Sequence, residues 1–147
     1  MTYTFTPTEI LSRNEDDGTM PENVERLGQA VVGRRIVSFE SPVTIKGRYW
    51  GTSTAARLTL DDGTIVTLAN TSDCCAYTEL DGFLLNADKI DHIITGVSTE
   101  GGYTKWHIFA DAGDVLELNV GWSSGNPFYY GYGFDIVVAT PGQEEEY

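Results

Sequence analysis

The feature that most constrains this fold is a β-hairpin signature in the first half of the chain, Ala56-Arg57-Leu58-Thr59-Leu60-Asp61-Asp62-Gly63-Thr64-Ile65-Val66-Thr67-Leu68. Two runs rich in strand-forming residues flank an Asp-Gly turn, which is a strong local signal for two antiparallel strands. A similar pattern recurs over residues 106–118, where an acidic turn with glycine again separates two apolar runs. The sequence therefore predicts two similar three-strand meanders, as two sheets or as two halves of one twisted sheet.

One short helix is predicted before the strands, over residues 21–30. Pro21 suits a first helical position, and Val24, Leu27 and Val31 recur at helical spacing. The segment 71–89 between the two halves is predicted to be a single helical turn or an irregular crossover. Further strands are predicted at residues 36–39, 43–45, 90–98, 103–110, 115–120 and 134–139. The expected fold class is α+β, mainly an antiparallel β-sheet meander of about six to eight strands with one short N-terminal helix.

The length of 147 residues fits one domain, and 41% hydrophobic residues suffice for a core. We expect a flexible N-terminal arm over 1–20, a single α+β domain over 21–140 and an acidic disordered tail over 141–147. The apolar runs are too short to span a membrane, and the first ten residues lack the pattern of a signal peptide. The expected location is cytoplasmic, which means the host cell cytoplasm if the protein is phage-encoded.

The net charge of −13 argues against binding to nucleic acid or to an anionic membrane, because phosphate binding needs clustered basic side chains. Residues 31–60 nevertheless carry one acid and five bases, which are Arg34, Arg35, Lys46, Arg48 and Arg57. The favoured interpretation is that this basic segment pairs with the acidic remainder of the chain. The alternative is an anion site or a patch for a partner.

The two cysteines of the chain, Cys74 and Cys75, are adjacent and follow Asp73. Adjacent residues of a strand point to opposite faces, so the two thiols do not converge on a metal ion without an unusual turn. We favour a structural motif in which one cysteine packs in the core and Asp73 accepts backbone hydrogen bonds in a turn. The alternatives are a zinc site completed by His92 and His107, a vicinal disulfide, and a cysteine nucleophile paired with a histidine. No metal or cofactor is expected.

Catalytic signatures are missing from the sequence, which has no phosphate-binding glycine loop, nucleophile elbow or metalloprotease motif. The alternation of Trp106, His107 and Ile108 places the histidine opposite its neighbours and predicts an exposed strand histidine rather than a catalytic one. The paired aspartates lie in turns, where they serve backbone geometry. We therefore expect a protein that is not an enzyme.

The best candidates for binding are aromatic residues in glycine-rich surroundings. The first group lies within residues 121–134 and comprises Trp122, Phe128, Tyr129, Tyr130 and Tyr132. The second group is Arg48, Tyr49 and Trp50. Exposed Tyr and Trp side chains make good recognition surfaces, although the same aromatics could instead cover the end of a sheet.

Three parts of the chain resemble a known family: Leu58-x-Leu60-x-Asp62-Gly63, then Ser72-Asp73-Cys74-Cys75, then residues 93–101. The chain is similar over residues 31–140 to small uncharacterised domains of actinobacteriophages and some bacteria that carry an Asp-Cys-Cys signature. The resemblance implies an α+β domain and a phage origin, and it implies no activity.

The leading functional hypothesis is a phage-type accessory protein that acts by non-enzymatic binding to a host or phage macromolecule. The expected partner is a protein, or a second copy of the chain by self-association. One alternative is a structural protein of the virion or a self-assembling homo-oligomer. Another is a binder of small anions or nucleotides that uses the basic segment.

Overall fold

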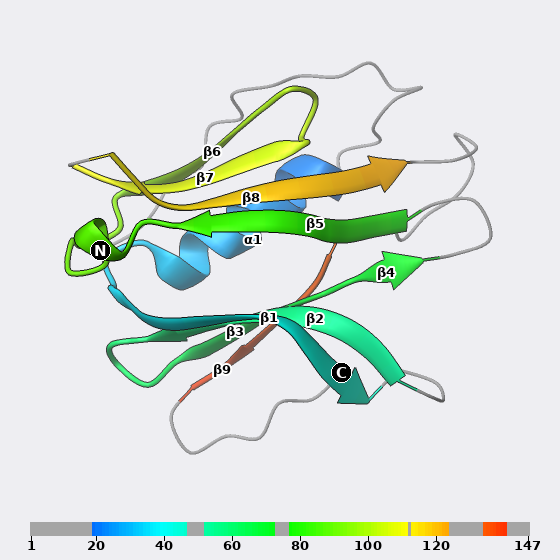
Figure 1. The fold of residues 1–147 in the computed structure, drawn as a ribbon, viewed down its shortest axis with the longest axis horizontal. Helices are drawn as coiled ribbons and strands as arrows, with labels where there is room; N and C mark the ends of the chain where they lie inside the picture. The colour runs from blue at the N-terminus through cyan, green and yellow to red at the C-terminus, as the bar shows by residue number, and fades with distance from the viewer. Residues whose placement is uncertain (1–18, 47–51, 73–76, 112, 124–133, 141–147) are drawn as a thin grey trace.

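The computed structural model describes residues 19–46, 52–72, 77–111, 113–123 and 134–140. The described chain forms one helix, one short 3-10 turn and nine strands (Figure 1). In order they are α1 (Thr19–Val31), β1 (Ile36–Lys46), β2 (Thr52–Leu60), β3 (Ile65–Ala69), β4 (Thr71–Ser72), β5 (Tyr77–Leu85), η1 (Ala87–Lys89), β6 (Gly96–Glu100), β7 (Lys105–Ala110), β8 (Gly113–Ser123) and β9 (Asp135–Ala139).

The strands form two antiparallel sheets, with the orders β1-β2-β3-β9 and β4-β5-β8-β7-β6. The predicted α+β class, with mainly antiparallel strands and one N-terminal helix, is confirmed. Both predicted meanders are present in separate sheets: β1-β2-β3 in the first and β6-β7-β8 in the second. Each meander also gains partners from elsewhere in the chain, because β9 pairs with β3 and β5 pairs with β8. Nine strands therefore form, slightly more than expected.

The prediction of a helical turn or crossover within 71–89 was wrong for β5. This segment is a strand that pairs with β8 from Tyr77↔Ser123 to Leu85↔Leu116. The register skips between Leu80 and Gly82, so Asp81 is an extra residue that breaks the two-residue alternation of apolar side chains. The apolar residues on either side of the skip then imitate helical spacing.

The prediction of a strand over 90–98 was wrong in its first half, because β6 begins only at Gly96. The preceding residues follow η1, and the backbone N–H of His92 donates to the carbonyl of Lys89. Ile94 then exchanges backbone hydrogen bonds with the loop after the helix, through Arg34 and Gly33. Ile94 is a β-branched residue with a buried side chain, so in the sequence it has the character of a strand residue. Its backbone nevertheless bonds to a loop rather than to a strand.

The core lies between the two sheets, and α1 completes it on one side (Figure 1). The helix buries Val24, Leu27 and Val31, the stripe that its sequence spacing predicts, and it also buries Met20 in its first turn. Full burial of each such side chain stabilises the fold by about 1.5–3 kcal/mol. Within the described part of the chain, no helix is long and apolar enough to cross a membrane.

The hairpin between β2 and β3 turns at Asp61, Asp62 and Gly63, where Gly63 has a φ of +87° that favours glycine. The backbone N–H of Thr64 donates to Oδ1 of Asp62 over 3.0 Å. Arg34 lies 2.8 Å from the other oxygen of Asp62, and Arg35 lies 3.4 Å from Asp61. The backbone hydrogen bond from Thr64, assisted by Arg34, lowers the pKa of Asp62 below its ordinary value. Arg34 and Arg35 thus pair internally, as the favoured interpretation of the basic segment expects.

A cleft at the crossing between the two sheets

The chain passes from the first sheet to the second through a single residue, Asn70, between β3 and β4. Its backbone N–H donates to the carbonyl of Thr54 over 3.0 Å, and its side-chain Nδ2 donates to the Thr54 hydroxyl over 2.7 Å. On the other side, its Oδ1 accepts the backbone N–H of Leu80 over 3.2 Å. One amide therefore ties β2 of the first sheet to β5 of the second.

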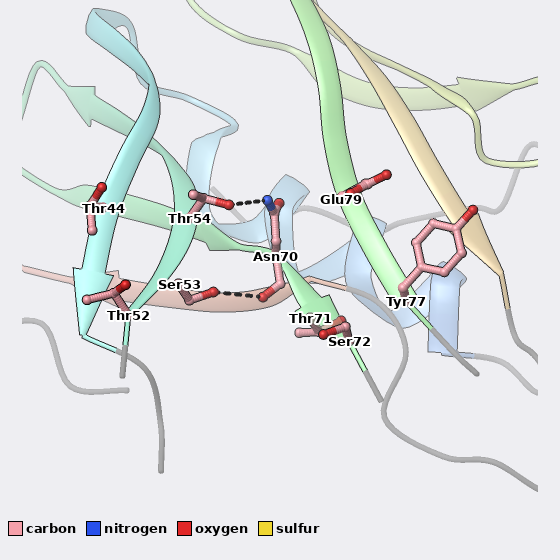
Figure 2. A pocket seen from close by; sticks show the side chains of 9 residues that line it. All are labelled: Thr44, Thr52, Ser53, Thr54, Asn70, Thr71, Ser72, Tyr77 and Glu79. Atoms are coloured by element: carbon pink, nitrogen blue, oxygen red, sulfur yellow. Dashed lines mark hydrogen bonds between the residues drawn. The ribbon is translucent and has the colours of Figure 1, made fainter. Parts of the chain in front are cut away.

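A cavity of about 600 Å³ lies beside Asn70, and we call it the threonine cleft (Figure 2). Its lining residues come from both sheets and include Asn70, where the chain crosses from one sheet to the other. Its lining residues are Thr44, Thr52, Ser53, Thr54, Asn70, Thr71, Ser72, Tyr77 and Glu79. Most of these are exposed, so the cleft opens to solvent. The volume lies within the roughly 300–1,000 Å³ of typical ligand sites.

The chemistry of the threonine cleft is that of hydroxyl groups, with one phenol, one amide and one carboxylate. Hydroxyl groups both donate and accept hydrogen bonds, so the lining suits polar partners of either kind. None of the described lining residues is Lys, Arg, His or Cys. The described lining thus offers neither a counter-charge for an anion nor a Ser–His or Cys–His pair, and Glu79 favours a neutral or cationic group.

Two of the sequence-predicted segments are next in the chain to residues that line this cleft. Arg48, Tyr49 and Trp50 belong to residues 47–51, which join β1 to β2 and lie outside the described residues. The residue after that segment, Thr52, lines the cleft.

The predicted structural motif Asp73, Cys74 and Cys75 also lies outside the described residues. It belongs to the segment 73–76, whose flanking residues, Ser72 and Tyr77, both line the cleft. In Figure 1, β4 and the start of β5 lie at the same end of the molecule as the junction of β1 and β2.

The aromatic group within 121–134 is mostly outside the described residues, including Phe128, Tyr129, Tyr130 and Tyr132. The strand before it, β8, ends at Ser123, which is the register partner of Tyr77 in the cleft. Ser123 therefore lies at the end of the molecule where the residues that flank the other two segments meet, whereas Phe134, which follows 124–133, is buried in the core against Trp106.

Trp122 is the one member of the first aromatic group that the structure describes, and it is half-buried. Its indole Nε1 donates to the carbonyl of Gly102 over 2.7 Å, and its ring meets that of Tyr103 edge to face at 6.5 Å. Trp106 donates to the carbonyl of Tyr103 over 2.9 Å. The indoles of Trp106 and Trp122 thus both donate hydrogen bonds to the turn between β6 and β7, so Trp122 has a structural role there.

Sequence reasoning missed a second group of polar residues on β6, β7 and β8, which we call the outer-face cluster: Glu100, Lys105, His107, Asp114 and Glu117. Nδ1 of His107 lies 2.8 Å from Asp114, and its Nε2 lies 3.4 Å from Glu100. Lys105 lies 3.0 Å from Glu117, whose hydrogen bond raises the pKa of the Lys105 ammonium above its ordinary value. The expected exposure of His107 was too high, because its side chain is only 18% exposed.

The two histidines have separate acidic partners in the structure. His92 lies 3.3 Å from Asp111, a contact between two largely exposed side chains, whereas His107 contacts Asp114. The proposed zinc set with the cysteines involves residues outside the described part of the chain. In the described part of the chain, each histidine contacts carboxylates instead.

Comparison with known proteins gives one result. The family model of a domain of unknown function (DUF7448) matches residues 29–136, which is most of the chain. No curated protein and no solved structure matches it. The match agrees with the resemblance to uncharacterised domains described above. The phage origin and the significance of the Asp-Cys-Cys signature remain predictions.

Proposed function

We propose, from the premise that this chain belongs to the DUF7448 family of domains of unknown function, that it is a non-enzymatic binding domain. The partner is a host or phage protein that contacts the end of the molecule carrying the threonine cleft. One observation carries this proposal. Thr52, Ser72 and Tyr77, which flank two of the sequence-predicted segments, line that cleft, and Ser123, which precedes most of the third, pairs with Tyr77. A phage-type accessory protein in the host cytoplasm is the setting that the sequence resemblance suggests.

The exposed surface of β5 extends this contact area away from the cleft. Tyr77 is 39% exposed and Leu84 56%, and both lie on the outer face of the second sheet, where they pair with Ser123 and Glu117 of β8. Phe83 lies on the opposite face, where it pairs with the buried Leu118 and its ring meets that of Phe39 edge to face at 4.7 Å. Aromatic residues beside hydrogen-bonding groups are typical of the centres of protein interfaces. Glu79 and Asp81 add negative charge along the same strand. A partner surface with apolar and basic side chains would complement this combination.

Site-specific photo-cross-linking tests the proposal directly. A photoreactive phenylalanine analogue replaces Tyr77 in the cleft, or, as a matched control, Val138 on β9. Val138 is similarly exposed at 42%, but β9 is the edge of the first sheet opposite β1. In bacterial cells that produce the full chain, we expect a discrete adduct with a second protein from position 77 and none from position 138. Ser72→Arg, which places a bulky cation in the cleft, should remove that adduct.

The alternatives give different products in the same experiment. An adduct of two copies of the chain, with a defined oligomer in native mass spectrometry, would favour self-association. Equal adducts from positions 77 and 138, or none from either, would contradict the proposal. The anion-binding alternative predicts a rise in melting temperature with nucleotides that Arg48→Ala abolishes. Two of the basic residues on which it draws, Arg34 and Arg35, are already paired with acids.

A further inference from the structure

The outer-face cluster owes its geometry to the pairing of β7 with β8, which are neighbours in the second sheet (Figure 1). His107 and Glu117 are direct register partners, so their side chains share one face of the sheet. The register skips between Ile108 and Phe109, and the skip puts Glu117 on the same face as Asp114, which lies three residues earlier in the chain and 2.8 Å from His107. One nitrogen and two carboxylate oxygens, one from each residue, lie within 4.8 Å of one another.

We propose that His107, Asp114 and Glu117 form a binding site for a divalent transition-metal ion, with zinc as the test ion. An imidazole nitrogen with two carboxylate oxygens is a donor set that zinc accepts, and sites with three protein ligands leave a position for water. The side chains are partly shielded, with 18%, 36% and 22% exposed, respectively. This proposal is independent of the proposed function, because none of the three residues lines the threonine cleft.

The charges around His107 call for an added cation. Three carboxylates, those of Glu100, Asp114 and Glu117, and one ammonium, that of Lys105, give a net charge of −2 around a neutral imidazole. A neutral imidazole carries only one N–H, yet each of its ring nitrogens here faces a carboxylate. A metal ion bound to one ring nitrogen leaves the other nitrogen to carry the N–H and donate it to the carboxylate that it faces.

Lys105 is the built-in competitor for the proposed ion. Its ammonium lies 3.0 Å from Oε1 of Glu117, so a metal ion must displace it from that oxygen. Removal of the ammonium should therefore strengthen metal binding. If the cluster were only a structural charge network, loss of Lys105 would leave Glu117 without its partner and would not strengthen metal binding.

Isothermal titration calorimetry and native mass spectrometry with Zn²⁺ test the site. The full chain carries Cys74→Ser and Cys75→Ser, so that thiolates do not contribute. We expect one zinc ion per chain. The near-isosteric changes Asp114→Asn and Glu117→Gln should each weaken binding at least about 10-fold, the lower limit known even for indirect partners of metal ligands. Lys105→Met should tighten binding roughly 2- to 5-fold, the size expected for loss of one exposed ion pair.

His92→Ala is the matched control. His92 lies 3.3 Å from one carboxylate among the described residues, that of Asp111, so its replacement should leave zinc binding unchanged. Circular dichroism and melting temperature establish that each variant is folded. The proposal is overturned if no zinc binds to the Cys-free chain. It is also overturned if Asp114→Asn binds zinc as tightly as the parent, or if Lys105→Met weakens binding.

Discussion

The side-chain oxygen of Asn70 accepts the backbone N–H of Leu80 over 3.2 Å, and this contact fastens the crossing point of the chain to the edge strand β5. β4 pairs only with Tyr77 and Thr78, so a described strand covers only the first part of that edge. An uncovered N–H on a strand edge is a template for unwanted pairing. Asn70 removes one such donor and holds the wall of the threonine cleft at the same time.

Asn70→Ala should lower the free energy of unfolding by about 1–3 kcal/mol, because two side-chain hydrogen bonds of about 0.5–1.5 kcal/mol each are lost. Urea unfolding at neutral pH measures the change. Ser53→Ala is the matched control. The Ser53 hydroxyl donates to the backbone carbonyl of Asn70 over a long 3.5 Å. Loss of this hydroxyl should therefore change the free energy of unfolding by less than about 0.5 kcal/mol. Equal effects of the two changes would contradict this role of Asn70.

Asp62→Asn should destabilise the protein at neutral pH and have a smaller effect in acid. The folded-state pKa of Asp62 is depressed by the Thr64 backbone N–H and by Arg34. Its contribution is therefore present above the unfolded pKa of about 3.9 and is lost as the pH falls through the lower folded value. The side chain is 44% exposed, so solvent screening keeps the effect below about 1 kcal/mol. Urea unfolding of both proteins between pH 7 and pH 3 measures the difference in their free energies of unfolding, which should shrink below about pH 4. A difference that stays constant over this range would show that the charge of Asp62 is not responsible.

Trp122→Phe should lower the free energy of unfolding by about 1–2 kcal/mol. The ring is retained, but the indole N–H no longer reaches the carbonyl of Gly102, and some apolar contact is lost. Thermal unfolding followed by circular dichroism is a suitable measurement. Tyr77→Phe, at an exposed aromatic position, should remain within about 0.5 kcal/mol of the parent. A neutral Trp122→Phe would mean that the turn between β6 and β7 is held without the indole.

Gly96→Ala should destabilise the protein by about 1–3 kcal/mol, because the added Cβ would lie 2.6 Å from Cζ of the Phe109 ring. Phe109 is the register partner of Gly96 across β6 and β7, and its ring covers the glycine. Phe109→Leu removes the obstacle, so the double variant should be more stable than the sum of the two single effects predicts. A double-mutant cycle in urea measures that coupling. Strict additivity would indicate that the ring moves aside freely.

The parts of the fold that sequence analysis predicted correctly depend on local signals. The Asp61-Asp62-Gly63 turn fixes its own hairpin, and the spacing of Val24, Leu27 and Val31 fixes the buried face of the helix. The strand β5 could not be predicted in this way. Its alternation is broken at Asp81, and only the long pairing with β8 shows that the backbone is extended.

Neither the outer-face cluster nor the threonine cleft could be predicted from the sequence, because both depend on contacts between distant strands. Without the register skip between Ile108 and Phe109, the two-residue turn after Ala110 would place His107 opposite Leu116 rather than Glu117. The cluster therefore depends on a bulge that the sequence does not signal. The threonine cleft is lined largely by Ser and Thr, and Thr is common in strands, so its members carry no distinctive pattern.

The pairing of β9 with β3 has a consequence for how the protein is made. Asp135 pairs with Ala69, and Ala139 with Ile65, so the first sheet gains its fourth strand only after the whole second meander has been synthesised. Contacts between such distant parts of a chain form slowly, because a large loop must close first. On the ribosome, the first meander must therefore wait with the open edge of β3 exposed to other chains. Until β9 pairs with it, this edge of β3 is open to pairing with other chains.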